Sequence, residues 1–139
     1  MVTTNEKIKY FKSELKNYRY YKEAYNECCL KLEEIAVKLR GVSSTTPKEV
    51  IPGASSVRYY NDNKVELMLK EDELVKERDT YLNHIENIEH KLELLEQEEQ
   101  DVLKSIYVYN HSFIEVADKV YMSTKSLQRY IKRIIKKIM

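Results

Sequence analysis

Apolar residues recur along two long stretches of the chain with alternating steps of three and four. In the first stretch, a seven-residue repeat runs from Ile8 to Leu39 and is interrupted only at Lys22. Because such steps place side chains on one stripe of a helix, the repeat predicts a single long N-terminal helix over residues 1–40. The residues of this stripe are Ile8, Phe11, Leu15, Tyr18, Tyr25, Cys29, Leu32, Ala36 and Leu39.

Polar and helix-breaking residues mark the ends of this helix and the connection after it. Thr3 followed by Glu6 predicts a capping box at the start, and Gly41 is a residue suited to the end. Residues 41–61 have no apolar periodicity and are rich in Ser, Thr, Gly and Pro. This stretch is therefore predicted to be a linker.

The second apolar repeat predicts another long helix, over residues 62–96. Its positions are Leu67, Leu74, Tyr81, Ile85, Ile88, Leu92 and Leu95, with Met68, Val75 and Leu82 widening the stripe. Two helices of similar length joined by such a linker can form a long antiparallel hairpin, within one chain or between two subunits. Because each stripe then meets only one partner, we expect a homodimer or docking onto the C-terminal helices.

From residue 97 onward the periodic units become short. The segment EQDVLKSIYVY predicts one helix, which the polar residues NHS end. Its inward-facing residues are expected to be Val102, Leu103 and Ile106.

Two further helices follow, each with a predicted cap. Ser112 with Glu115 forms a capping-box pattern before FIEVADKV, and Ser123 is placed to cap the last helix. A turn is expected at Tyr121 and Met122. Three short helices, the last two joined by a tight turn, predict a helix-turn-helix domain over residues 97–139.

Composition agrees with this helical pattern. The 139 residues include only two Gly and two Pro, and 34% of them are charged. Scarcity of helix breakers favours long uninterrupted helices. The expected fold is all-α: a long antiparallel helical hairpin followed by a C-terminal three-helix helix-turn-helix domain.

Charge is segregated along the chain although the net charge is only +1. Residues 61–99 carry five Lys/Arg against thirteen Asp/Glu, whereas residues 119–139 carry seven against none. On the last predicted helix, an apolar row and a basic row are offset by two positions, or about 200° around the axis. The apolar row is Leu127, Ile131, Ile134 and Ile138, and the basic row is Lys125, Arg129, Lys132 and Lys136. One side is therefore expected to pack while the other presents cations.

The residue types on the basic side are those that contact DNA. Arg129 can bind guanine O6 and N7 through its bidentate fork, and Gln128 can pair with adenine. Thr124 and Lys125 lie on the first turn, the part of a recognition helix that enters the major groove. Candidates for phosphate contacts, further along the helix, are Lys132, Arg133, Lys136 and Lys137.

A solvated basic face is the alternative interpretation of this helix. The helix dipole favours cations near a C-terminus, which accounts for Lys136 and Lys137. It does not account for Lys125, for Arg129 or for the absence of every Asp and Glu.

The segment SFIEVADKVYMSTKSLQRYIKRIIKKI resembles the C-terminal helix-turn-helix of sigma-70 factors, region 4. The preceding LEQEEQDVLKSIYVYNHS resembles the lead-in helix of that family, so the likeness covers about residues 95–138. Tyr121 departs from the pattern, because that family commonly has Gly there. The family positions are filled by Glu115, Val116, Ala117, Val120, Met122, Ser123, Leu127 and Lys136.

The layout of the whole chain is similar to that of the RinA/ArpU-type late transcriptional regulators of phages and mobile elements. This resemblance implies sequence-specific binding to promoter or operator DNA and activation of late genes in a bacterial host. It places base contacts at Thr124, Lys125, Gln128 and Arg129, and it makes RNA polymerase a further candidate partner. The chain has no counterpart of the sigma segments that bind the −10 element or core polymerase, so a complete sigma factor is not expected.

Catalytic and metal-binding patterns are not evident. Two Gly cannot build a phosphate-binding loop, and no nucleophile can be paired with a base by spacing. We therefore expect no enzyme, no catalytic residue, no cofactor and no metal site. A signal-peptide-like start and a run of about 18 apolar residues are both missing, so the expected location is the cytoplasm, with no membrane contact. The residues without a metal-ligand pattern are His84, His90, His111, Cys28 and Cys29.

Two other functions stay open on the sequence. A phage small terminase-like DNA-recognition subunit also joins a helix-turn-helix to oligomerising helices. A coiled-coil protein-binding adaptor would use the basic C-terminal end to meet an acidic partner.

Overall fold

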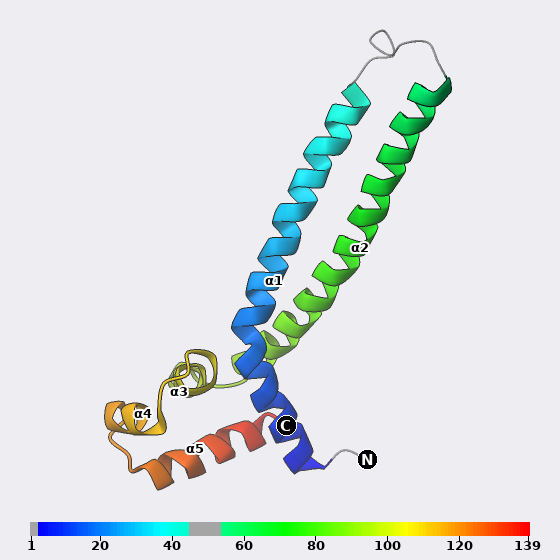
Figure 1. Ribbon diagram of the computed structural model, residues 1–139. Coiled ribbons are helices and arrows are strands. Elements are labelled where there is room, and N and C mark those ends of the chain that lie inside the picture. The colour runs from blue at the N-terminus through cyan, green and yellow to red at the C-terminus, as the bar shows by residue number, and fades with distance from the viewer. Residues whose placement is uncertain (1–2, 45–53) are drawn as a thin grey trace. The chain divides into compact units, whose positions relative to one another are not determined.

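The computed structural model describes the backbone of residues 3–44 and 54–139 and the side chains of residues 3–41 and 63–139. Within these ranges the chain is helical and has no β-strand, which confirms the predicted all-α class (Figure 1). The elements are α1 (Thr4–Ser44), α2 (Ala54–Glu93), α3 (Gln97–Leu103), the π-helix η2 (Lys104–Val108), α4 (Phe113–Lys119) and α5 (Thr124–Lys137).

Two compact units divide the chain. Unit 1 comprises Met1–Lys22 and Asn83–Met139, and unit 2 comprises Glu23–Leu82. Unit 1 therefore contains the first turns of α1, the last turns of α2 and all of the short helices. The middle and end of α1 and most of α2 belong to unit 2.

The first long helix begins as predicted and ends later than predicted. The Thr3 hydroxyl accepts a hydrogen bond from the Glu6 amide at 3.2 Å, and the Thr3 amide donates to the Glu6 carboxylate at 3.3 Å. The helix then continues through Gly41 to Ser44. A Cβ at Gly41 would meet nothing within 4 Å, and Gly inside a helix costs only about 1 kcal/mol. Gly41 is therefore compatible with a helix end, but it does not by itself terminate α1, which continues to Ser44.

The predicted linker is wrong at both of its ends, because the backbone is helical up to Ser44 and again from Ala54. Residues 45–53 of that linker lie outside the described part of the chain. Apolar periodicity reports a buried face, and helical backbone can extend beyond such a face where no breaker intervenes. The second helix also stops at Glu93, three residues before the predicted end.

Unit 1 has a continuous apolar core. From α1 it buries Ile8, Phe11, Leu15 and Tyr18, and from α5 it buries Leu127, Ile131, Ile134 and Ile135. Further buried side chains come from α2, α3, η2 and α4. The prediction that Ile138 packs is wrong in degree, since Ile138 is half-buried while Ile135 is fully buried. The reason is that α5 ends at Lys137, so Ile138 no longer follows the helical phase.

Polar contacts inside unit 1 join α1 to α2. Glu14 is buried, and its carboxylate lies 3.0 Å from His84 Nδ1 and accepts from the Tyr21 hydroxyl at 3.2 Å. The Tyr21 ring stacks on His84 at 4.5 Å between ring centroids. One turn further along α1, the Tyr18 hydroxyl donates to the Glu89 carboxylate at 2.7 Å.

Unit 2 has a narrow seam in place of a core. Among its described side chains only Cys28 and Ile35 are buried apolar residues, whereas the sequence had pointed to the neighbouring Cys29 and Ala36. The stripe is wider than predicted, because Cys28 faces α2, where its thiol lies 3.9 Å from the Glu77 carboxylate. Met68 was predicted to widen the α2 stripe and is instead exposed.

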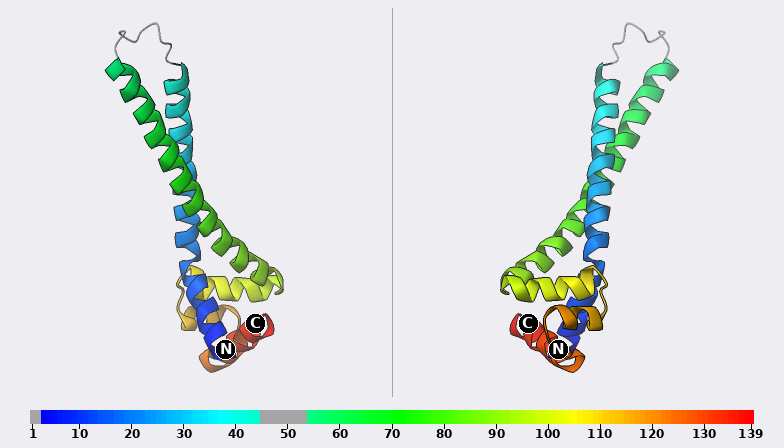
Figure 2. Two further views of the ribbon diagram at one scale, coloured as in Figure 1. Left: turned by 90° about the vertical axis from the view of Figure 1, so that its right-hand side faces the viewer. Right: turned by 90° about the vertical axis from the view of Figure 1, so that its left-hand side faces the viewer.

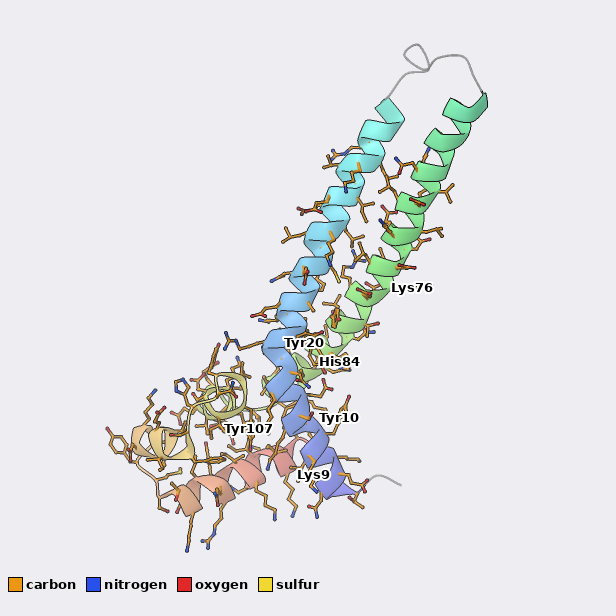
Figure 3. The ribbon with its side chains drawn as sticks, viewed as in Figure 1. Lys9, Tyr10, Tyr20, Lys76, His84 and Tyr107 are labelled. Atoms are coloured by element: carbon orange, nitrogen blue, oxygen red, sulfur yellow. The ribbon has the colours of Figure 1, made fainter. Side chains whose placement is uncertain are left out.

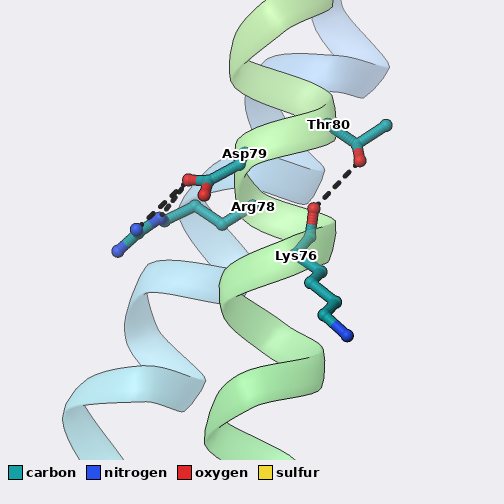
Figure 4. Close-up of polar contacts among 4 residues, drawn as sticks. All are labelled: Lys76, Arg78, Asp79 and Thr80. Atoms are coloured by element: carbon teal, nitrogen blue, oxygen red, sulfur yellow. Dashed lines mark hydrogen bonds and ion pairs between the residues drawn. The ribbon is translucent and has the colours of Figure 1, made fainter.

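Several other polar contacts of unit 2 run along α2 itself (Figure 4). Arg78 donates from two nitrogens to the neighbouring Asp79 carboxylate, each at 3.2 Å. Thr80 donates to the Lys76 carbonyl at 2.9 Å. These contacts satisfy charges and hydroxyls locally and do not tie one long helix to the other.

The short helices of unit 1 pack against one another. Helix α3 contacts α5, and α4 contacts both η2 and α5 (Figure 2). The single helix predicted for EQDVLKSIYVY is instead an α-helix followed by a π-helical turn, in which the Tyr109 amide donates to the Lys104 carbonyl at 2.9 Å. The predicted inward residues Val102, Leu103 and Ile106 are buried, as are Tyr107 and Val108.

Candidate nucleic-acid interface

Helices α4 and α5 are joined by a short capped turn. Ser112 accepts from the Glu115 amide at 3.1 Å and Ser123 accepts from the Ser126 amide at 3.1 Å, which confirms both predicted N-caps. The reciprocal half of the predicted Ser112–Glu115 capping box is wrong. The Glu115 carboxylate lies instead 3.2 Å from His111 Nδ1, on its N-terminal side.

The turn after α4 reverses the chain through a left-handed residue. Tyr121 has φ 56°, and its amide donates to the Asp118 carbonyl at 3.4 Å while the Met122 amide donates to the Ala117 carbonyl at 2.9 Å. This pair of bonds is the Schellman arrangement, in which Gly usually occupies the left-handed position. Here a Tyr occupies it, with 96% of its surface exposed, so the side chain offers little packing in return for the backbone strain.

Helix α5 is fixed in place by its apolar row and by one ion pair. The row of Leu127, Ile131, Ile134 and Ile135 is at most 2% exposed. At the end of the helix, Lys137 Nζ lies 3.5 Å from the Glu99 carboxylate of α3. A rigid, packed inner side is what holds an outer side in a constant orientation.

The outer side of α5 carries a basic face made of Lys125, Arg129, Lys132, Arg133 and Lys136, all of them exposed. Four of these, from Arg129 to Lys136, line a shallow depression of about 320 Å³ in which every lining residue is a cation. In the part of the chain that the structure describes, no carboxylate forms an ion pair with any residue of the basic face. The face is thus free to bind a polyanion.

The predicted base-contacting residues lie beside this basic face. Thr124 and Gln128 are exposed on the first turns of α5, next to Lys125 and Arg129. Seven of the eight candidate residues, all except Lys137, are therefore exposed on α5 and are not part of its buried apolar row. Lys137, the eighth candidate, lies 3.5 Å from the Glu99 carboxylate and so stands apart from them.

One cation close to α5 is not suggested by the C-terminal sequence pattern. Lys12 of α1 is half-buried, and this burial is the main cause that lowers its pKa. The positive charges of Lys16 and of Lys132 on α5 lower the same pKa further. Lys12 and Lys132 are 120 positions apart, so only the packing of α1 in unit 1 brings their charges together. The helical spacing of Lys9, Lys12 and Lys16 along α1 is the sequence signal for this contribution.

Other chemistry is sparse in the described residues. No group of three or more His, Cys, Asp or Glu side chains there could hold a metal ion, and both cysteines are free. His84 and His111 each lie beside a single Glu. Searching the same residues for a helix both long enough and apolar enough to cross a membrane finds none.

Comparisons with protein-family models, with curated proteins and with solved structures gave no match to this chain.

Proposed function

We propose that this chain is a sequence-specific DNA-binding protein in which α4 and α5 act as a helix-turn-helix and α5 is the recognition helix. The observation that carries the proposal is the basic face of α5, unneutralised within the described residues and held outward by a buried apolar row. DNA is the polyanion that such a face fits best, because Lys and Arg bind phosphates while Arg and Gln read base edges.

Each candidate residue then has a role. Thr124, Lys125, Gln128 and Arg129 lie on the N-terminal half of α5 and contact base edges in the major groove. Lys132, Arg133 and Lys136 lie further along and contact phosphates, which position the helix.

Regulation of transcription is the biological role that we propose for this binding. It is supported by the resemblance of residues 95–138 to sigma-70 region 4 and of the layout to RinA/ArpU-type late regulators. Activation of phage or mobile-element genes from a promoter, in the cytoplasm of a bacterial host, follows from that resemblance, with RNA polymerase as a candidate partner.

A matched pair of neighbouring lysines tests the interface. Lys136→Ala removes a cation of the basic face, whereas Lys137→Ala removes one that is drawn to Glu99. We expect Lys136→Ala to weaken binding to all duplexes alike and to lower the slope of log K against log salt by about 0.9. Lys137→Ala should leave both quantities close to those of the wild type. Fluorescence anisotropy with random-sequence duplexes from low to high salt measures this.

Specificity needs a separate measurement, on an operator selected from genomic fragments. We expect Arg129→Ala to weaken operator binding by about 1–3 kcal/mol and to relax preference at one base position. Equal operator affinity of Arg129→Ala and wild type would remove the assignment of α5 as a reading helix.

Unit 2 supports a second candidate function, that of a protein-binding adaptor. Large apolar side chains are more than half exposed there, among them Leu30, Val37 and Leu69. An adaptor whose basic end meets an acidic protein predicts no detectable DNA binding even at low salt. The anisotropy titration described above therefore separates the two functions.

A further inference from the structure

The first turns of α1 carry a row of cations with helical spacing. Residues 3–22 contain six Lys/Arg and two Glu. Four of the six are separated by three, four and three residues, which places them within about 80° on one side of the helix. These four are Lys9, Lys12, Lys16 and Arg19, and we call them the α1 row.

Acidic neighbours do not neutralise the α1 row. Glu6 is engaged in the capping box with Thr3, and Glu14 is buried against His84 and Tyr21. Within the described part of the chain, no member of the row forms an ion pair. Lys9, Lys16 and Arg19 are exposed, and Lys12 is half-buried.

Packing within unit 1 turns this row toward the C-terminal helices. Lys12 Nζ lies 6.0 Å from the centroid of the Tyr107 ring of η2, and Arg19 Cζ lies 6.0 Å from the centroid of Tyr109, which follows η2. Lys12 also feels the positive charge of Lys132 on α5. The first turns of α1 lie beside α5 in every view, with Lys9 on these turns (Figures 1, 2 and 3).

The α1 row therefore adds a second set of cations on a helix that lies beside α5, and Lys12 and Lys132 are near enough for their charges to interact. Bringing like charges together is unfavourable unless a polyanion binds across them. From Lys9 to Arg19 the row covers ten steps of the helix, or about 15 Å along α1, which is the axial rise of about four phosphates of one DNA strand. A single anionic side chain of a partner protein would match only part of such a row.

We propose that Lys9, Lys12, Lys16 and Arg19 of α1 form a second phosphate-binding row that grips the backbone of the same duplex beside the segment contacted by α5. This inference rests on the proposed function, since it needs DNA on α5. It assigns to α1 a part in binding that increases affinity for every duplex without reading sequence, because its members would contact phosphates only.

Two double variants of equal charge test the row. Lys9→Gln/Lys16→Gln removes two exposed members of it. Lys7→Gln/Lys22→Gln removes two exposed lysines of the same α1 turns that lie outside it. Both variants are compared with the wild-type full chain by anisotropy on random-sequence and operator duplexes across salt, and circular dichroism checks that each is folded.

We expect the row variant to bind every duplex about tenfold more weakly at moderate salt. Its log–log salt slope should fall by about 1.8, the value for two lost phosphate contacts, while the ratio of operator to random affinity stays constant. The Lys7→Gln/Lys22→Gln protein should stay within about twofold of wild type, with its slope unchanged.

Outcomes that overturn this inference differ from those that overturn the proposed function. An unchanged slope in the row variant, or equal losses in the two double variants, overturns the α1 row and leaves Lys136→Ala and Arg129→Ala to test α5 independently. An unchanged slope would also favour an acidic protein surface as the ligand of the row. If the wild type binds no duplex, the proposed function fails and the row falls with it.

Discussion

Unit 1 and unit 2 share the same two long helices, yet they bury very different amounts of apolar surface. In unit 1 the helices meet α3, η2, α4 and α5, and side chains such as Phe11, Leu103 and Leu127 are at most 1% exposed. In unit 2 the described helices bury Cys28 and Ile35 while Leu30 is 60% exposed. An amphipathic helix has a single apolar face. A longer helix therefore enlarges the core only where several other elements pack against that face.

This contrast bears directly on the candidate interface. Cations on the solvent-exposed side of a helix do not stabilise its position in the fold. The packing of the opposite, apolar side must therefore hold the helix in place. Unit 1 supplies that inner side for both α1 and α5. The described side chains of unit 2 supply no comparable support, and the homodimer, or the docking onto the C-terminal helices, that the sequence predicts stays a prediction.

The largest expected effect compares two leucines, one in each unit. Leu127→Ala removes a fully buried side chain of α5 and should destabilise the protein by about 2–5 kcal/mol. Leu69→Ala, at a site 58% exposed, should change stability by less than about 0.5 kcal/mol. Urea unfolding followed by circular dichroism gives both numbers. Similar losses in the free energy of unfolding for Leu127→Ala and Leu69→Ala would mean that Leu69 is packed, for example against a partner, and would contradict the contrast between the two units.

Alkaline pH offers a second comparison, through tyrosines. Burial, together with the hydrogen bond to Glu89, raises the pKa of Tyr18, so the folded state keeps the phenol proton more tightly than the unfolded chain does. A raised folded pKa contributes stability that is fully present below the unfolded value near 10 and is lost as pH rises above it. Wild type should therefore lose stability above about pH 10 by up to about 1.4 kcal/mol per pH unit from this group.

Substitution of Tyr18 separates this contribution from the titration of lysines. Tyr18→Phe should cost about 1 kcal/mol near pH 7, where the bond to Glu89 is lost, and the difference from wild type should shrink above pH 10. The pKa of Tyr25 in unit 2 is also raised, but the largest cause there is a hydrogen bond with Cys29, whereas for Tyr18 the largest cause is burial. Tyr25→Phe should therefore flatten the alkaline loss much less. A constant difference between Tyr18→Phe and wild type from pH 7 to 11 would contradict the assignment.

The left-handed residue of the α4–α5 turn gives a smaller effect of opposite sign. Tyr121→Gly should stabilise unit 1 by about 1 kcal/mol, because Gly adopts φ near 56° without the Cβ strain and the exposed ring loses no packing. Asn110, with φ 57°, is the matched control, since Asn tolerates this region better than Tyr. Thermal unfolding should show a gain for Tyr121→Gly and little change for Asn110→Gly.

Local signals in the sequence predicted much of unit 1. The caps at Thr3, Ser112 and Ser123 depend on residues three apart, so they can be seen without tertiary structure. The periodicity of α5 likewise predicted three of its four buried residues, and it missed Ile135. The turn predicted at Tyr121 and Met122 is likewise present, with Tyr121 in the left-handed region.

Features that depend on distant parts of the chain were not predictable in this way. The π-helical turn after Leu103 was not predicted, and its residues Ile106 and Tyr107 are buried in a core that distant parts of the chain build. The approach of Lys12 to Lys132 requires α1 to pack beside α5, although the three-four-three spacing of the α1 row could have been seen. The helix ends at Ser44 and Ala54 were not predicted, because a helical backbone does not require apolar periodicity in the sequence.

The smallest predicted effect tests whether the two units unfold together. Gly41→Ala meets no obstruction and should stabilise the end of α1 by about 1 kcal/mol, since Ala is the better helix former. The described part of unit 2 buries few apolar side chains, so we expect it to open locally without unfolding of unit 1. In that case the added stability slows amide hydrogen exchange near residue 41 by about fivefold, and the urea midpoint of the whole protein does not change. If the urea midpoint instead rises by the shift that corresponds to about 1 kcal/mol, unit 2 unfolds cooperatively with unit 1. The contacts around Cys28 and Ile35 would then be sufficient to couple the unfolding of the two units.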